Sequence, residues 1–413
     1  MDAHAVSRRG TGDAGACAAG PAAAGQYTMK ERLRIVLASR FLVGYPQGGG
    51  HWSAFLQHLL GLDALGHDVF WLELYDPPDG RHDEVLARAF GERMEALGFA
   101  RRWALGLANA ETTPDLEMLD VVGADVAHVR RVVREADLLW NFACAVKPPL
   151  LGRFKRRALV DGDPGIIQIS AEQHDLGLDA HEVLFTAGLC VGDPDCPVPT
   201  LGRRWVRFPQ FVHLPSWPDP GPPPPGARFT SITQWNWGEV WHEGASYSVS
   251  KRDAYMQFVD LPRRCRAEFE LAANMDPRDP TGDLAHLRAA GWSLVDPHDV
   301  ASSPDNYRAY IGRSRAEFCC PKPVYVQMRT GWMSDRSAGF LASARPVLMQ
   351  DTGLDRHLPV GEGLLIFSDL DMAAAATDAI ESNYAAQSAA ARRFAEEHLN
   401  ATKVLSDMLE TAR

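Results

Sequence analysis

Short apolar runs alternate along this chain with amphipathic segments and glycine-rich loops. The first run, residues 33–38, is continuous, which is typical of a strand buried on both faces of a parallel sheet. A loop with three glycines at 48–50 follows, then helical spacing over 51–60 and a second apolar run over 69–72. Strand, glycine-rich loop, helix and strand in this order predict the first βαβ unit of a doubly wound sheet.

A proline-rich segment interrupts this pattern, which then starts again. Residues 215–225 hold seven prolines in eleven positions, which excludes a helix or a central strand there. Beyond it we expect a strand over 229–233 and a helix over 251–259. Residues 371–410 are alanine-rich and are predicted to be helical throughout.

These boundaries define five predicted segments of an α/β protein. Residues 1–30 are expected to be a disordered tail, 31–213 a Rossmann-like domain, 214–227 the linker, 228–385 a second Rossmann-like domain and 386–413 a C-terminal helix.

The N-terminal tail has no targeting pattern. Residues 1–28 are rich in alanine and glycine and lack the continuous apolar stretch of a signal peptide. Met29 stands just before the first strand, and we hypothesise that translation starts there.

Composition and charge limit the function. The chain has 413 residues, of which 46% are apolar and 23% charged, as in ordinary globular domains. Acids outnumber bases by 53 to 42, and the net charge of −11 argues against a nucleic-acid binder. No apolar window is long enough for a transmembrane helix. Seven cysteines without a CxxC pair predict reduced thiols in a cytoplasmic protein and no structural zinc.

The loop before the first predicted helix is one candidate site. Gly48, Gly49 and Gly50 allow a ligand to approach the backbone closely, and the free N–H groups of a helix N-terminus suit a phosphate. We predict a phosphate- or acceptor-binding loop, with a purely structural turn as the alternative. His51 is a candidate acid or base, or a capping residue.

A second candidate site follows the strand predicted over 157–161. Asp161 and Asp163 stand two residues apart, and Pro164 and Gly165 force a sharp turn after them. Carboxylates placed in this way can act as a general base, bind sugar hydroxyls or hold a metal. The alternative is a turn with two solvated acids.

Cations and N-cap residues gather at the starts of predicted helices in the second half. A cation is unfavourable at a helix N-terminus unless an anion binds there, so a phosphate is expected. The candidate donor-binding residues are Lys251, Arg252, Lys322, Ser334, Asp335, Arg336 and Ser337, together with the loop residues Asp351, Thr352 and Gly353. Solvated cations and a plain turn are the alternatives.

Taken together, these residues resemble bacterial glycosyltransferases of the GT-B fold. The resemblance covers about residues 32–410 and is most specific in the segments 334–337, 342–347, 350–353 and 358–364. It implies two Rossmann-like domains facing across a cleft, with the acceptor on the first domain and a nucleotide-sugar donor on the second. It also implies that the C-terminal helix crosses back to the first domain.

One feature departs from that family. Many retaining members carry two glutamates eight residues apart, and counting back from Pro346 places them at Gly331 and Gly339. The usual acidic contacts to the donor ribose and sugar are therefore missing, and a retaining outcome is not assumed.

The chemistry then follows from charge. The leaving diphosphate gains negative charge that must be stabilised, and helix N-termini with cations take the place of a metal. The residues assigned to this role are Lys251, Arg252, Lys322, Arg336 and Ser337. Asp163 is expected to take the acceptor proton, with Asp161 or His51 as alternatives.

We therefore predict a bacterial hexosyltransferase-type enzyme that moves a sugar from a nucleotide-diphosphate sugar to a hydroxyl or amine of a small-molecule or peptidic acceptor. It is expected to need no metal or other cofactor, to bind no nucleic acid and to work in natural-product or surface-glycan biosynthesis, and a homodimer is left open. The alternatives are a GT-B-fold sugar-nucleotide epimerase or phosphorylase, and a non-catalytic subunit that binds a nucleotide sugar. An oxidoreductase is disfavoured because neither half has a GxGxxG followed by an acid.

Overall fold

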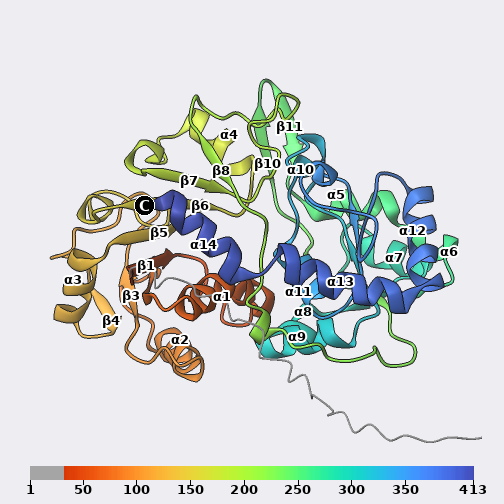
Figure 1. Cartoon of the computed structure of the whole chain (residues 1–413), viewed down its shortest axis with the longest axis horizontal. Helices are drawn as coiled ribbons and strands as arrows, with labels where there is room; N and C mark the ends of the chain where they lie inside the picture. Colours follow the sequence, from red (N-terminus) through yellow and green to blue (C-terminus); the bar gives the residue numbers. More distant parts are fainter. Residues whose placement is uncertain (1–31) are drawn as a thin grey trace, which may run out of the picture. The chain divides into compact units, whose positions relative to one another are not determined.

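Two largely parallel sheets organise residues 32–413, which are the residues that the computed structural model describes (Figure 1). One sheet lies in the N-terminal half, residues 33–213, and the other in the C-terminal half, residues 228–385. The expected tail over 1–30 and the start at Met29 lie outside the described residues. The exact division into domains stays a prediction.

The sheet of the N-terminal half has eight strands in the order β4-β3-β2-β1-β5-β6-β7-β8, all parallel except β4, which runs antiparallel to β3. The strands are β1 Arg34–Ser39, β2 Asp68–Tyr75, β3 Trp103–Leu107, β4 Val121–Gly123, β5 Leu138–Phe142, β6 Arg157–Asp161, β7 Val183–Thr186 and β8 Trp205–Arg207. Ile35 to Ala38 of β1 are at most 1% exposed, as expected for a central strand with helices on both faces.

The sheet of the C-terminal half has six parallel strands in the order β13-β12-β9-β14-β15-β16. The strands are β9 Phe229–Gln234, β12 Phe269–Asn274, β13 Ser293–Val295, β14 Ala316–Cys319, β15 Val347–Gln350 and β16 Leu364–Phe367. In chain order this is the 3-2-1-4-5-6 arrangement of a Rossmann fold. An antiparallel hairpin of β10 Glu239–His242 and β11 Ala245–Ser248 stands between β9 and the next helix of the chain.

Helices connect these strands. The helices are α1 Gly49–Ala64, α2 Glu84–Ala96, α3 Val126–Glu135, α4 Ile166–Gln173, α5 Lys251–Tyr255, α6 Leu261–Arg264, α7 Asp283–Ala290, α8 Pro297–Ala301, α9 Pro304–Arg313, α10 Pro323–Gln327, α11 Asp335–Ala342, α12 Leu370–Ser382, α13 Tyr384–His398 and α14 Ala401–Ala412. Short 3-10 turns are η1 Leu150–Arg153, η2 Leu178–Ala180, η3 Leu214–Ser216, η4 Met256–Phe258 and η5 Leu354–Arg356.

Two predicted helices are interrupted. The helix expected over 251–259 ends at Tyr255 and continues as the 3-10 turn η4. The segment 371–410 forms three helices rather than one, because Asn383 has a non-helical backbone and Asn400 caps a new helix by accepting from the Thr402 backbone N–H. Alanine content predicted the helices but not these breaks.

The last helix returns to the N-terminal half, as the GT-B resemblance implied. Helix α14 packs on α1, where a side chain at Gly61 would collide with Leu405 (Figure 1). A backbone bridge between Val212 and Asn400 fixes the point of return.

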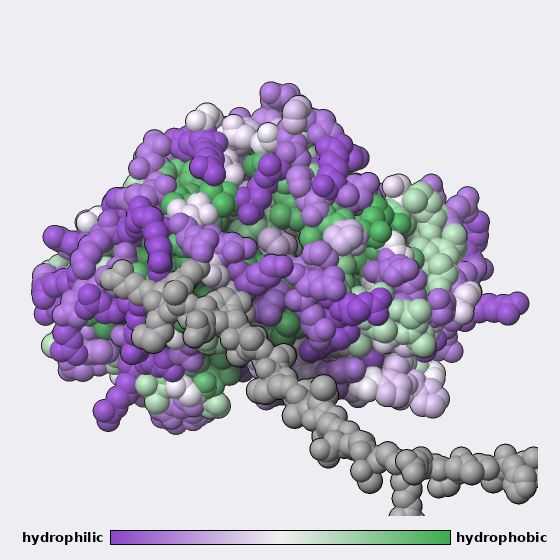
Figure 2. All heavy atoms as spheres, in the orientation of Figure 1, coloured by the Kyte–Doolittle hydropathy of each residue, from purple (hydrophilic) through white to green (hydrophobic). Residues whose placement is uncertain are grey.

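The surface and the thiols agree with the composition. Hydrophilic side chains cover most of the face shown in Figure 2, with smaller apolar areas between them. No helix among the described residues is long and apolar enough to cross a membrane. The six cysteines that lie within the described residues are unbridged.

Candidate active site

Some of the candidate residues follow strands at which the order of a sheet reverses, whereas Asp161, Asp163 and the loop after β15 stand at the ends of the strands next to these. In open α/β sheets, ligands bind beyond the carboxyl ends of the strands at such points. The reversal lies between β1 and β5 in one sheet and between β9 and β14 in the other. His51 stands near the start of the helix after β1, and Lys322 follows three residues after the end of β14.

Asp161 and Asp163 have opposite environments although they are two residues apart. Asp161 is fully buried, and its carboxylate accepts hydrogen bonds from the Asp163 backbone, Gln168 Nε2 and Thr186 Oγ1 at 2.9–3.0 Å. Burial raises the pKa of Asp161 to about 6. With every contact internal, Asp161 shapes the turn that presents Asp163, whose side chain is 56% exposed.

Asp163 contacts two side chains of the C-terminal half. Lys322 Nζ lies 2.8 Å from its Oδ1, and the Tyr325 hydroxyl donates to the same atom. Desolvation by the surrounding protein would raise the pKa of Asp163, but Lys322 and these hydrogen bonds hold it below its ordinary value. Asp163 is therefore a charged carboxylate that fixes Lys322, and a weak base.

Two aromatic residues of the C-terminal half complete this contact. The rings of Tyr325 and Trp332 pack with centroids 4.8 Å apart, and Trp332 Nε1 donates to the Gly162 carbonyl at 3.1 Å. Both rings are buried. Sequence reasoning missed both residues, although Tyr325 follows Lys322 by three residues, a spacing that places both at the start of one short helix.

Lys251 opens helix α5 and is half-buried among other cations. Its ammonium lies 5.7 Å from the centre of the Trp332 ring, and no carboxylate of residues 32–413 forms an ion pair with it. Desolvation lowers the pKa of Lys251 to about 8, and the charges of Arg336 and Lys322 add to the effect. An unpaired ammonium with this environment gains most from a bound anion.

Arg252 and Arg336, which were also predicted to bind phosphate, have internal partners. Arg252 forms a two-pronged ion pair with Asp283, with N–O distances of 2.7 and 2.8 Å. Arg336 is only 6% exposed, and its guanidinium donates to Glu317 and, at 2.7 Å, to the Ile232 carbonyl. Both guanidinium groups tie strands and helices together, and their part in donor binding stays a prediction.

His51 lies on the N-terminal half among aromatic rings. Its Nε2 donates to the Phe41 carbonyl at 2.9 Å, because a carbonyl can only accept, and this leaves Nδ1 as the acceptor of the neutral ring. Desolvation lowers its pKa, while the nearby carboxylates of Asp335 and Asp163 oppose the shift. His51 is thus a neutral base at pH 7, close to Asp163 and to the start of α11.

The three glycines before His51 allow the start of α1 to pack closely against other parts of the chain. A Cβ on Gly49 would lie 2.2 Å from the Ser303 carbonyl oxygen, and one on Gly50 would lie 2.8 Å from the Tyr307 ring. A Cβ on Gly48 would meet the Tyr45 ring at 2.2 Å. The start of α1 therefore packs directly on α8 and α9 of the C-terminal half, and a role in phosphate or acceptor binding stays a prediction.

The start of α11 combines a cap with buried groups. Ser334 accepts the Arg336 backbone N–H at 3.2 Å, Ser337 is fully buried beside Cys319, and Asp335 is half-buried within electrostatic reach of His51. The three residues thus flank Arg336 at the start of α11, and their contact with a donor stays a prediction.

The loop after β15 supports its neighbours. The Asp351 carboxylate accepts the Gly353 backbone N–H at 2.7 Å, and Thr352 Oγ1 donates to the Trp332 carbonyl at 2.8 Å. This turn therefore positions the Trp332 loop, and its predicted contact with the donor stays a prediction.

The two glycines at the family's glutamate positions are enclosed. A Cβ at Gly331 would lie 2.7 Å from Cys190 Sγ, and φ there is +67°. A Cβ at Gly339 would lie 2.7 Å from the Trp217 ring. Neither position has room for a glutamate, so any contact of this chain with a donor sugar and ribose is made by other groups.

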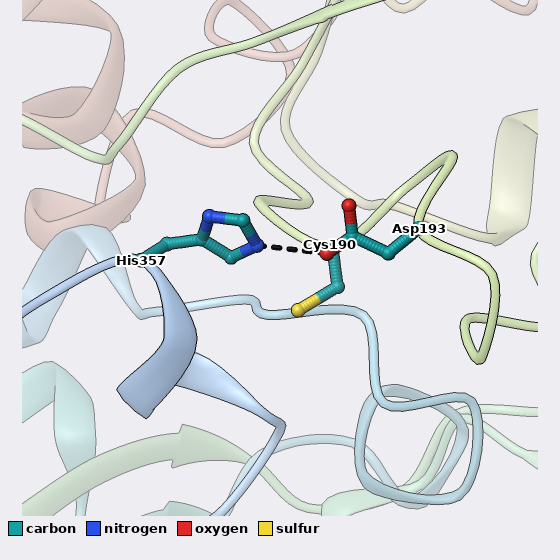
Figure 3. Close-up of side chains that lie close together, drawn as sticks. All are labelled: Cys190, Asp193 and His357. Carbon is teal, nitrogen blue, oxygen red and sulfur yellow. Dashed lines mark hydrogen bonds and ion pairs between the residues drawn. The ribbon is translucent and has the colours of Figure 1, made fainter.

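Three neighbouring side chains carry atoms of the kinds that bind metal ions. Cys190, Asp193 and His357 place a sulfur, an oxygen and a nitrogen within 4.8 Å of one another (Figure 3). His357 Nε2 lies 2.9 Å from Asp193, Arg207 lies 2.6 Å from the same carboxylate, and Cys190 Sγ donates to the Gly353 carbonyl. Burial raises the pKa of Cys190 to about 11. These partners favour a contact between the two halves over a cation site.

Comparison with known proteins places the fold in one class. No protein-family model and no curated protein matches the chain. Among solved structures, an alpha-glucosyltransferase in complex with UDP and a mismatched 13-mer DNA matches 93% of this chain and 100% of its own, with a TM-score of 0.57 and 11% identity. The chain has the GT-B fold of two Rossmann-like domains with a returning C-terminal helix.

Two further structures give the same result. Anabaena HepE in complex with UDP and glucose matches 91% of this chain and 98% of its own, with a TM-score of 0.56 and 10% identity. AviGT4, a glycosyltransferase involved in avilamycin A biosynthesis, matches 92% and 97%, with a TM-score of 0.53 and 13% identity. At these identities the likeness shows the fold, and function is argued from the site.

Proposed function

We propose that this protein is a glycosyltransferase that moves a sugar from a nucleotide-diphosphate sugar to a hydroxyl or amine of an acceptor. The observation that carries the proposal is Lys251, a cation without an ion-pair partner among the described residues, whose pKa is lowered by desolvation and by the charges of Arg336 and Lys322. Because Lys322 and Arg336 are each paired with one carboxylate, the charge of Lys251 is the one that a phosphate would balance. The fold adds support, because the similar solved structures include complexes with UDP.

The cations act on the leaving group. When the bond between the anomeric carbon and the phosphate oxygen breaks, its electron pair stays on the diphosphate, and negative charge grows there. Lys251 and Lys322 stabilise that charge from fixed positions, since Lys322 is held by Asp163 and Tyr325. This arrangement supplies the positive charge that a metal ion supplies in other transferases.

His51 is the residue best suited to take the acceptor proton. As the acceptor oxygen bonds to the anomeric carbon, its proton passes to Nδ1, because Nε2 is engaged by the Phe41 carbonyl. Asp163 was expected to have this role, but its contact with Lys322 and its lowered pKa make it a weaker base. Asp161 is buried away from any acceptor and holds the turn.

The acceptor is proposed to be a small or peptidic molecule in natural-product or surface-glycan biosynthesis. Three of the similar structures contain DNA, but the net charge of −11 disfavours a nucleic-acid acceptor here. A cytoplasmic location accords with the free thiols of the described residues.

The first experiment is a thermal-shift panel with UDP, GDP, dTDP, ADP and NAD. A ligand at 100 times its Kd stabilises by about 2.7 kcal/mol, so a shift with one nucleoside diphosphate and none with NAD is expected. The same donor, as its sugar conjugate, should then be consumed in an assay with candidate acceptors. The proposal is contradicted if the wild-type protein, in which Lys251 is present, shows no thermal shift with any of these nucleotides.

A non-catalytic role is the second candidate, and the enclosed glycines favour it. Gly331 and Gly339 leave no room for the carboxylates that many retaining relatives use. A protein that binds a nucleoside diphosphate but neither hydrolyses nor transfers its sugar would be a binding subunit. Product analysis without acceptor also separates an epimerase or phosphorylase.

A further inference from the structure

Two tryptophans, one in strand β10 and one two residues before it, differ from all the others. Nine of the eleven tryptophans are at most 9% exposed, whereas Trp237 is 70% and Trp241 is 54% exposed. Burying a large aromatic ring stabilises a protein. Two such rings left exposed so close together in the sequence therefore indicate a surface that is covered by a ligand.

One ring lies on the hairpin and the other just before it. Trp237, Glu239 and Trp241 are exposed, as are Asn236 and Gly238, while Val240 and His242 of β10 are more buried. Because Trp237 and Trp241 are four residues apart, their Cα atoms are separated by at most about 14 Å, with Glu239 between them in the sequence. This span suits a short oligosaccharide better than a single sugar.

The inner face of the hairpin is anchored on the N-terminal half. His242 Nδ1 lies 2.8 Å from the Glu172 carboxylate, and Gln173 Nε2 donates to the Trp241 carbonyl at 3.4 Å. Val240 packs against the core of the N-terminal half (Figure 1 shows β10 near α4). The hairpin is thus fixed in place, and its outer face does not need a further protein element to hold it.

The Trp237 end of this segment lies beside the start of α5, whose first residue is Lys251. The Trp237 backbone N–H donates to Ser250 Oγ at 2.8 Å, and Ser250 directly precedes Lys251. Strand β11 also packs against α10, the helix that carries Tyr325. An acceptor on this face would therefore reach the donor phosphates at one end.

Glu239 supplies polar contacts between the rings. Its carboxylate accepts from Trp241 Nε1 at 3.0 Å and from the Ser246 hydroxyl, which fixes its position. A carboxylate has about four lone-pair sites, so two stay free for sugar hydroxyls. Aromatic rings that meet the C–H faces of pyranoses, with a carboxylate between them, form a carbohydrate-binding surface.

We propose that this face, formed by Trp237, Glu239 and Trp241, binds the acceptor as a carbohydrate chain. The proposal rests on the proposed transferase activity, and it replaces the small or peptidic acceptor proposed above with a carbohydrate chain. The free protein should therefore bind an oligosaccharide even without a donor.

Binding is tested with maltohexaose, cellohexaose, chitohexaose and mannohexaose, followed by tryptophan emission and by isothermal titration. At least one oligosaccharide should bind, and the double variant Trp237→Ala/Trp241→Ala should weaken its binding at least tenfold. Glu239→Gln should weaken it about fivefold. Met118→Ala, which removes an exposed apolar side chain elsewhere, should have no effect.

Donor measurements separate the two proposals. In the double variant, the thermal shift with the nucleotide and donor hydrolysis should match the wild type, which also shows that the variant is folded. If the wild type binds the nucleotide but none of the oligosaccharides, the carbohydrate surface is overturned and the transferase proposal stands. The same conclusion follows if sugar is transferred only to phenolic acceptors such as 4-nitrophenol. Absence of nucleotide binding in the wild type overturns the transferase instead.

Discussion

The two halves of the candidate site carry opposite chemistry. The N-terminal half presents His51 and the carboxylate of Asp163, whereas the C-terminal half presents Lys251 and Lys322. A neutral imidazole and a charged carboxylate lie on one side, and cations for a diphosphate on the other. Under the proposed function, this difference divides the work, with proton transfer on the N-terminal half and charge stabilisation on the C-terminal half.

Removing the base should have the largest effect. His51→Ala is expected to lower kcat by about 10³-fold, because it removes the group proposed to take the acceptor proton. Affinity for the nucleotide should stay unchanged. The matched control is His298→Ala, a nearby histidine that bonds to Tyr45 and Asp296. A kcat within threefold of wild type would assign the proton to another group.

Asp163→Asn should act less strongly, through Lys322. Turnover is expected to fall by about 10²-fold with donor binding kept, because the amide no longer fixes the Lys322 ammonium by charge. Steady-state kinetics with the donor varied would separate kcat from KM. An effect larger than that of His51→Ala would make Asp163 the base and reverse the assignment.

Lys251→Met should mainly weaken binding. Loss of one charge-assisted contact of about 2 kcal/mol raises the Kd for the nucleoside diphosphate about 30-fold. The control is the adjacent Arg252→Gln, which breaks the pair with Asp283 and should lower stability while leaving Kd within about twofold. Equal losses of affinity in both variants would contradict the distinction between the two cations.

The pH dependence of nucleotide binding reports on the same lysine. With a pKa of about 8 in the free protein, Lys251 loses its proton as pH rises, and an anion binds only the charged form well. The Kd should be flat below pH 7 and should rise by up to about tenfold per pH unit above 8. Titration calorimetry should show proton uptake on binding at pH 8.5. Lys251→Met should remove this dependence, and a flat wild-type profile would count against the charge model.

Gly49→Ala tests how closely the two halves pack and should affect stability rather than chemistry. Its Cβ would lie 2.2 Å from the Ser303 carbonyl oxygen, so the free energy of unfolding should fall by about 2 kcal/mol. Gly44→Ala in the same loop is the control, since nothing lies within 4 Å of its added Cβ. Urea denaturation measures both. Equal stability of the two variants would show that the halves separate easily at this contact.

Sequence patterns predicted the fold well because burial periodicity and proline content act locally. The apolar runs gave β1, β2, β6 and β9. The breaks at Asn383 and Asn400 escaped prediction, since alanine-rich sequence favours helix regardless of tertiary contacts.

The candidate site was predictable in its residue types but not in its pairings. Lys251 and Arg252 are adjacent and equally charged, yet only Arg252 meets a partner, Asp283, which is 31 residues away in sequence. Arg336 likewise meets Glu317. Glycines before His51 indicated a close approach, but sequence alone does not distinguish a ligand from another part of the chain.

The enclosed glycines have a consequence for engineering and for descent. Introducing glutamate at position 331 would require the Cys190 segment to move and the backbone to leave its positive φ, and at position 339 the Trp217 ring would have to be replaced. No single substitution therefore restores the common acidic pair. Proteins descended from a chain with this packing would have to change several residues together to regain the acidic pair. Redesign of donor preference should therefore begin from Lys251 and Lys322.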